Sequence, residues 1–387
     1  MKTTYRTSIR RRLEIGRAPY RPPWSRRKVG HRPIVAPLGA TLAAGVAVGV
    51  AVVLARATRE RRTQPLPDLD RRLGLKPDET LAHGLQRMAL GQVDLALEQL
   101  AGASAGEKRA EKAVHETRKA LKRLRALLRL LRRELGEDAF AREDAAVRDI
   151  ARQLSGARDA EVMLATLDAL IERHPRKLAR RKGVRRLRRA LLAEHERTEH
   201  QTLGDGAALE HVLTELRDLR VRVVAWPLRD RDATRQVDAG LRDLYAQGRK
   251  RYRRAERTRG KDIHAMHLWR KRVKDLRYVA EMLERGSKSQ KKRRGRSAHL
   301  HRLADRADTL AEVLGEDHDL AVLAERVRAQ AKPGNRARKK SKRVGRATRK
   351  ALLKQIARRR RKLRRQALRE GERLYRRGPK RFVRELS

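Results

Sequence analysis

Residues 115–125 read HETRKALKRLR, and residues 267–277 read HLWRKRVKDLR. The two stretches share the pattern H-x-x-R-K-x-[LV]-K-x-L-R at a displacement of 152 residues. A second match follows, because LSGARDAEV at 154–162 resembles LGEDHDLAV at 314–322 at a displacement of 160 residues. Two matches in the same order and at nearly the same displacement indicate an internal duplication. They predict two similar helical halves related by a pseudo-twofold axis.

The basic side chains of each repeat share one face of a helix. At about 100° per residue, positions 115, 118, 122 and 125 fall within an arc of roughly 80°, beside an arc of leucines. Like charges at i and i+4 destabilise a helix by a few tenths of a kcal/mol each, so such a stripe is unfavourable unless an anion offsets it. The pattern therefore predicts two rows of cations that converge on one anionic ligand: His115, Arg118, Lys122 and Arg125 in the first copy, and His267, Arg270, Lys274 and Arg277 in the second.

Other interpretations of these residues stay open. Arginine and lysine can extend from a bundle surface without any ligand. Each histidine is either a partly buried ring bonded to a carboxylate such as Asp159 or Asp319, or a direct contact to phosphate. Arg249 and Arg253 share one face of the preceding helix and are further candidates for the same basic groove.

The composition favours an all-α fold and an anionic partner. The chain has 387 residues, with 101 Lys or Arg against 47 Asp or Glu, which gives a formal net charge of +54. That excess favours nucleic acid, an anionic membrane or another polyphosphate as partner. Hydrophobic residues at 39 % suffice for a core, whereas 3 % aromatic residues argue against a β-rich fold. The absence of cysteine excludes disulfides, thiol catalysis and Cys-ligated metals.

Four segments follow one another along the chain. We expect a basic tail at 1–32, an apolar helix at 33–55, a linker at 56–78 and a helical domain at 79–385 with halves 79–228 and 236–385. Within this domain we predict an N-cap at Asp78, helix breaks at Gly136 and Gly183, and helix stops at His174-Pro175 and Trp226-Pro227. We interpret 285–297 and 332–350 as solvated loops or extensions.

The apolar segment has three competing interpretations. Residues 38–55 carry no charge and approach the roughly 20 apolar residues that a membrane-spanning helix needs. The segment is an uncleaved anchor, an export signal preceded by the loose twin-arginine pattern at 25–28, or a peripheral apolar helix. Six Lys or Arg lie in 13–32 and six in 56–75, so the flanking charges do not orient a span.

The sequence resembles the CHAD family, the conserved-histidine α-helical domain, over about residues 79–385. The resemblance rests on both histidine repeats, Arg158-Asp159, Trp226-Pro227-Leu228, Leu314-Gly315 and Asp319. It implies two four-helix-bundle halves whose basic helices line a central channel that binds inorganic polyphosphate. It also adds Arg123 and Lys271 to the candidate binding residues. The copies differ, since Asp275 replaces Arg123 and His318 replaces Arg158, so the halves need not contribute equally.

We therefore expect noncatalytic polyphosphate binding at a membrane or on cytoplasmic polyphosphate-bearing bodies. The alternative is a nonspecific nucleic-acid binder, with secondary contacts through 332–365. An enzyme of polyphosphate metabolism is disfavoured because no GxxxxGK[ST], HExxH or ExExK motif occurs. We expect no cofactor, and we interpret His299-x-His301 and 317–319 as ordinary helix residues rather than metal ligands.

Overall fold

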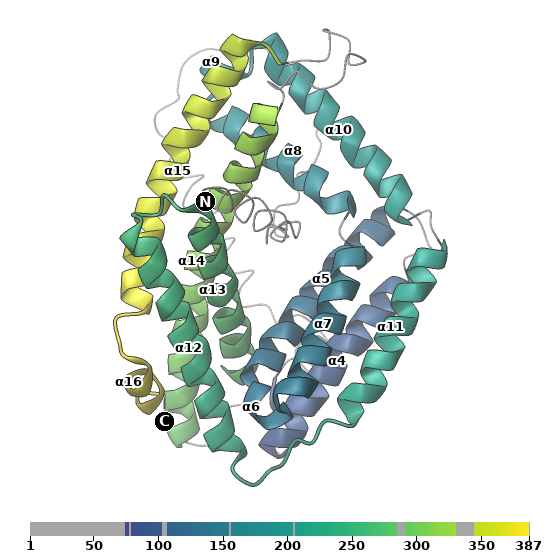
Figure 1. Ribbon diagram of the computed structural model, residues 1–387, viewed down its shortest axis with the longest axis vertical. Coiled ribbons are helices and arrows are strands. Elements are labelled where there is room, and N and C mark those ends of the chain that lie inside the picture. Colours follow the sequence, from purple (N-terminus) through teal and green to yellow (C-terminus); the bar gives the residue numbers. More distant parts are fainter. Residues whose placement is uncertain are drawn as a thin grey trace, which may run out of the picture.

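The computed structural model describes residues 74–76, 79–102, 107–154, 156–203, 206–284, 291–329 and 344–386. These residues form thirteen α-helices and include no β-strand, which confirms the all-α prediction (Figure 1). The predicted tail at 1–32, the apolar helix at 33–55 and most of the linker at 56–78 lie outside these residues. Within the described ranges, no helix is long and apolar enough to cross a bilayer.

The first half is built on a bundle of four helices with a short helix at one corner. The bundle consists of α4 (Leu81–Ala101), α5 (Glu107–Leu130), α7 (Glu137–Gln153) and α11 (Gly206–Val224), and the corner helix is α6 (Arg132–Leu135). A second helix pair extends beyond this bundle and is connected by α9: α8 (Gly156–Arg173), α9 (Pro175–Leu178) and α10 (Lys182–Leu203).

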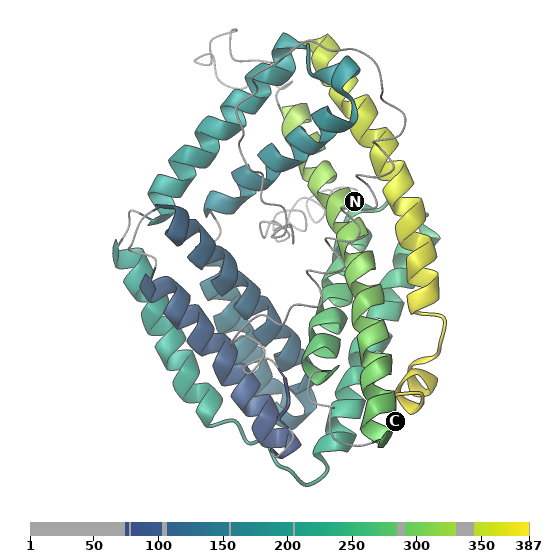
Figure 2. The ribbon, with the colours of Figure 1, turned by 180° about the vertical axis from the view of Figure 1, so that it is seen from behind.

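The second half repeats this order with helices of different length. Its elements are α12 (Ala233–Arg257), α13 (Ile263–Glu284), α14 (Lys291–Ala329), α15 (Arg346–Leu374) and α16 (Pro379–Arg384). The short α16 packs on α12 as α11 packs on α4. The halves meet where α5 packs on α12 and α13, and meet again at the opposite end, where α9 contacts α15 (Figures 1 and 2).

The structures of the two copies differ at one point. The matched segments 154–162 and 314–322 lie in different structures, because α7 ends at Gln153 and α8 begins at Gly156, whereas α14 continues through Leu314 as a single helix. The guanidinium of Arg118 donates hydrogen bonds to the carbonyls of Ala151 and Leu154 at 2.5 and 3.0 Å. This contact satisfies acceptors that the end of α7 leaves open and stabilises the break.

Several predicted helix limits are confirmed. Gly136 separates α6 from α7 with φ of 78°, in the left-handed region where glycine is favoured. Helix α8 ends at Arg173, directly before His174-Pro175, and α11 ends at Val224, just before Trp226-Pro227.

Other predicted limits are wrong. Thr80 caps α4, since its hydroxyl accepts from the backbone of His83, whereas Asp78 lies outside the described residues. Gly183 lies in the first turn of α10 rather than between helices. Its small size matters there for packing, because an added Cβ would lie 2.8 Å from the Thr348 hydroxyl on α15.

The predicted loops 285–297 and 332–350 are also partly helical. Helix α14 begins at Lys291 and α15 begins at Arg346. Lysine and arginine have good helix propensity, so a high density of positive charge does not by itself indicate a loop. The remaining parts of the two predicted loops lie largely outside the described residues.

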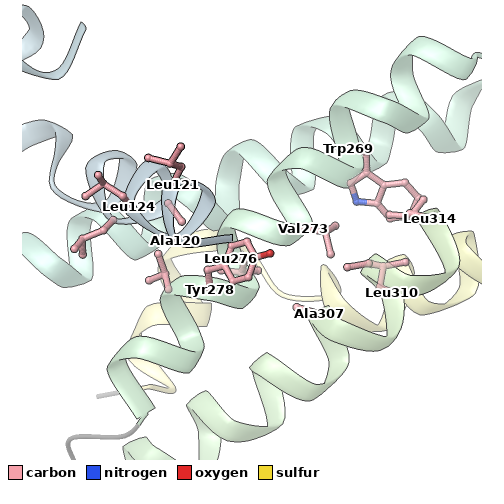
Figure 3. Packing of buried hydrophobic residues seen from close by; sticks show 14 of the residues in the cluster. Ala120, Leu121, Leu124, Trp269, Val273, Leu276, Tyr278, Ala307, Leu310 and Leu314 are labelled. Carbon is pink, nitrogen blue, oxygen red and sulfur yellow. The ribbon is translucent and has the colours of Figure 1, made fainter. Parts of the chain in front are cut away.

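The hydrophobic core runs through both halves. Figure 3 shows Leu121 and Leu124 of α5 near one end of this packing, and Trp269 of α13 against Leu314 of α14 at the other. The Trp269 side chain is completely buried. Because the apolar faces of α5 and α13 share this core, their basic residues are held beside each other at the contact between the halves.

Gly240 on α12 lies directly against the end of α5. A Cβ atom added there would lie 2.1 Å from the backbone carbonyl oxygen of Leu130, at the end of α5. A backbone atom cannot move aside as a flexible side chain can, so only glycine fits without displacing a helix.

We predict that Gly240→Ala lowers the free energy of unfolding by about 1–3 kcal/mol, because the new methyl group forces α12 away from α5. Urea unfolding measures this change. The matched control is Gly295→Ala on α14, where an added Cβ meets nothing within 4 Å. There the better helix propensity of alanine should raise stability by up to about 1 kcal/mol. Equal stability of the Gly240 variant and the parent would contradict this packing.

Candidate anion-binding site

Equivalent lysines of the two repeats meet where α5 crosses α13. Lys122 and Lys274 are separated by the repeat displacement of 152 residues. Burial lowers the pKa of the Lys274 ammonium well below its usual range, and the positive charges of Arg270 and Lys122 lower it further, whereas Asp319 acts in the opposite direction. The two lysines therefore lie near the pseudo-twofold axis and repel each other.

Lys274 is a buried cation at this crossing. Its side chain is 7 % exposed, and its Nζ atom has no hydrogen-bond partner among the described residues. Moving an ammonium from water into a protein interior is costly unless an anion or hydrogen-bond acceptors compensate. The fold thus holds a cation in a place that suits an anionic ligand.

Two imidazoles lie beside this lysine. The rings of His267 on α13 and His318 on α14 are 4.6 Å apart between centroids and inclined by 31°. Burial lowers the pKa of His267 to about 3, with Lys271 and Arg270 acting in the same direction. Burial and the adjacent His267 and Arg270 also lower the pKa of His318. Both rings are therefore neutral at neutral pH in the ligand-free protein.

Helix α15 contributes an arginine that the sequence did not indicate. Arg360 is 8 % exposed, and its Nε and Nη2 atoms donate to the two carboxylate oxygens of Asp317 at 2.9 and 3.2 Å. Arg364 donates to the same carboxylate at 3.1 Å. The charge of Arg360 contributes to the low pKa of His318, so Arg360 lies close to the histidine pair. We call the set of six residues the cation cluster: Lys122, His267, Arg270, Lys274, His318 and Arg360.

Three of the predicted stripe residues are already engaged by the protein itself. Arg118 binds the carbonyls at the end of α7, as described above. Arg125 forms a two-pronged ion pair with Asp144, at 2.9 and 2.8 Å. Arg277 binds Glu281 at 2.7 Å and also pairs with Asp308. For Arg125 and Arg277, the anions that offset the stripe come from within the fold.

The remaining stripe candidates lie around the cluster. Lys271 is exposed as a whole residue, but partial burial of its ammonium, together with Arg125 and Arg272, lowers its pKa. Arg123 is 9 % exposed and lies close enough to Glu116 and Tyr278 to affect their pKa values. His115 is half-buried and also lies near Glu116. The side chains of Arg158 and Asp159 lie outside the described residues, so the first-half counterpart of His318 is not described.

Arg249 and Arg253 are not brought into the cluster. Arg249 donates to the backbone carbonyl of Tyr375 at 3.1 Å, at the end of α15. The Tyr245 hydroxyl donates to the neighbouring carbonyls of Leu374 and Arg377, so these contacts fasten α15 to α12. Arg253 is exposed.

His299 and His301 on α14 make ordinary contacts with protein groups. His301 pairs with Glu284 at 2.7 Å and with Asp305 at 3.3 Å, and His299 contacts the carbonyl oxygen of Gly295. In the described part of the chain, no group of three or more His, Cys, Asp or Glu side chains is arranged to hold a metal ion.

Comparison with known proteins identifies the family. A solved structure of the CHAD domain from the plant Ricinus communis is similar to this chain, with a TM-score of 0.54 and 20 % sequence identity. The similarity covers 77 % of this chain and 93 % of the plant domain, and at this identity it shows the fold alone. No curated protein matches the sequence. The sequence model of the CHAD domain matches residues 91–328, which include both basic repeats and more than half of the chain, and the protein therefore belongs to the CHAD domain family.

Proposed function

We propose that this CHAD protein binds inorganic polyphosphate, without catalysing a reaction, at the cation cluster between its two halves. The observation that carries the proposal is the Lys274 ammonium, which is buried among other cations with no hydrogen-bond partner in the described structure. A bound phosphate oxygen would supply the missing acceptor. Arg270 would supply forked donors that match phosphate oxygens, and Arg360, whose Nε and Nη2 atoms are bound to Asp317, would contribute its Nη1 donors.

The burial of the cluster favours a slender anion over a nucleic-acid duplex. Arg270, Lys274 and Arg360 are between 3 and 8 % exposed, so only a narrow chain of phosphates can reach them. A duplex carries its phosphates on a wide, stiff cylinder that stays at a protein's surface. The aromatic rings nearest the basic repeat, Trp269 and Tyr278, are buried in the core and offer no surface on which a base can stack.

The proposal concerns binding alone. The carboxylate of Asp317, beside the cluster, is engaged by Arg360 and Arg364. These contacts hold Arg360 in position and leave the carboxylate no open role as a base. The secondary nucleic-acid contacts and the membrane association expected from the sequence are not part of the proposed site.

Lys274→Met separates the binding role of this lysine from a structural role. Removing the ammonium should weaken the affinity for long-chain polyphosphate at least about tenfold, or about 1.4 kcal/mol. The same change should raise the free energy of unfolding of the ligand-free protein by roughly 1 kcal/mol, because a buried ammonium without a hydrogen-bond partner among the described residues is replaced by an apolar chain of similar length. Isothermal titration calorimetry and urea unfolding measure the two effects.

The matched control is Lys250→Met, at an exposed position of α12. It removes the same charge and should change neither quantity appreciably. A Lys274 variant that is less stable than the parent and binds polyphosphate with undiminished affinity would show that the lysine has a structural role, and the proposed site would be wrong.

The low pKa of His267 gives a second test, in which stability and binding respond oppositely to acid. Between about pH 3 and pH 6.5, the unfolded chain binds a proton at His267 that the folded, ligand-free protein does not. The unfolding free energy should therefore fall as the pH is lowered through this range, and His267→Gln should reduce the slope. Bound phosphate raises the pKa of the ring, so polyphosphate affinity should increase on acidification and binding should take up protons.

Urea unfolding at several pH values measures the first effect, and calorimetry in buffers of different ionisation enthalpy counts the protons. His83→Gln is the control, because this ring is exposed on α4 and should leave both pH dependences as they are in the parent. Proton release on binding, or a steeper acid dependence in the His267 variant, would contradict the proposed geometry.

A further inference from the structure

We propose that the outer face of α15 is a second polyphosphate-binding surface, which continues the path of a long chain that is bound at the cation cluster. The inference rests on the proposed function and extends it, since it assigns a preference for long chains to a particular helix. We call this surface the outer ridge, and its residues are Lys350, Lys354, Arg358, Arg361, Lys362, Arg365 and Arg369.

The ridge is uniformly cationic. Its seven side chains belong to exposed residues, and they lie within an arc of roughly 120° along about 28 Å of helix, opposite the buried apolar face of α15. No Asp or Glu occurs between Glu325 and Glu370 in the sequence. The ion pairs of the described residues include none of these seven, whereas Arg359 and Arg360 on the inner side are bound to Glu316 and Asp317.

The arginines of α15 thus form two groups: those on the inner side are paired with carboxylates, and those on the outer side are not paired in the described part of the chain. The inner arginines of α15 are fixed by carboxylates of α14, so the fold can supply counter-charges where it needs rigid positions. The outer row has none and repels itself at i and i+4 spacing, which costs a few tenths of a kcal/mol per pair. An external polyanion would remove that repulsion.

A recess of about 150 Å³ lies between α14 and α15, and its lining includes one residue of the ridge and one of the cluster. It is lined by Arg328, Arg360, Arg361 and Arg364 together with apolar side chains of both helices. Arg360 belongs to the cluster and Arg361 to the ridge, so consecutive residues reach from one to the other. A phosphate chain bound at Arg360 would thus have the next cation of its path, Arg361, on the adjacent residue, at the start of the outer face.

The ridge fits a flexible phosphate chain better than it fits a membrane. The apolar residues of α15, among them Leu352, Ile356 and Leu363, are buried in the bundle, so the helix has no apolar face to insert into lipid. A chain tethered at the cluster has a high effective concentration near the ridge, so the added contacts strengthen the binding of long chains only.

The test compares two variants of the full chain that carry the same reduction in charge. The ridge variant is Arg358→Gln, Arg361→Gln, Arg365→Gln and Arg369→Gln. The control variant is Arg185→Gln, Arg186→Gln, Arg189→Gln and Arg197→Gln, at exposed positions of α10. Affinities for tripolyphosphate, long-chain polyphosphate and a short DNA duplex are measured over a range of salt concentrations, and circular dichroism verifies folding.

We expect the ridge variant to bind long-chain polyphosphate about tenfold more weakly than the control variant at low salt. Its salt dependence should be shallower by about 0.7 for each phosphate group that the ridge no longer neutralises. Its affinity for tripolyphosphate should stay within about twofold of the parent, because the cluster is intact.

Equal long-chain affinities of the ridge and control variants would overturn the inference and leave the proposed function in place. A ridge variant that binds only duplex DNA more weakly would also overturn it and would assign the ridge to nucleic acid. If the unmodified protein bound neither polyphosphate, the proposed function itself would fail, which is a different outcome from the first two.

Discussion

The candidate site is built around the ammonium of Lys274, which is buried without a hydrogen-bond partner among the described residues. Lys274 is held at the crossing of α5 and α13 because the apolar faces of both helices are committed to one core, which includes Leu124 and Trp269. The helices cannot turn their basic residues into solvent without exposing that core. Burial in this position, together with the neighbouring cations, lowers the pKa values of Lys274 and His267, and at Lys274 the charge of Asp319 offsets only part of that effect.

The duplicated fold produces an asymmetric site. Arg118 and Arg270 occupy equivalent positions, yet Arg118 caps the end of α7 whereas Arg270 lies beside the histidine pair. The cause is the interruption between α7 and α8, which the continuous α14 does not share. The second half thus supplies five of the six cluster residues, and the first half supplies Lys122. One extended ligand that crosses the axis suits this arrangement better than two identical ligands.

The sequence predicted the helices and the basic rows because both depend on local periodicity. It indicated the all-α class, the duplication and the participation of α5 and α13 for that reason. It did not indicate Arg360, whose partner Asp317 lies 43 residues away on another helix. It also did not show that Arg125 is neutralised by Asp144 on α7, or that Arg249 fastens the end of α15. Such pairings depend on how helices pack, and one helix's pattern does not contain that information.

Because the Lys274 ammonium has no hydrogen-bond acceptor among the described residues, its pKa should rise when phosphate binds, and lysine-selective NMR measures that change. The side-chain resonances of Lys274, assigned from Lys274→Met, are followed in a pH titration with and without polyphosphate. We expect a pKa well below that of ordinary lysines in the ligand-free protein and a clear rise when polyphosphate is added. An ordinary lysine pKa that does not change on adding polyphosphate would contradict the proposed binding at Lys274.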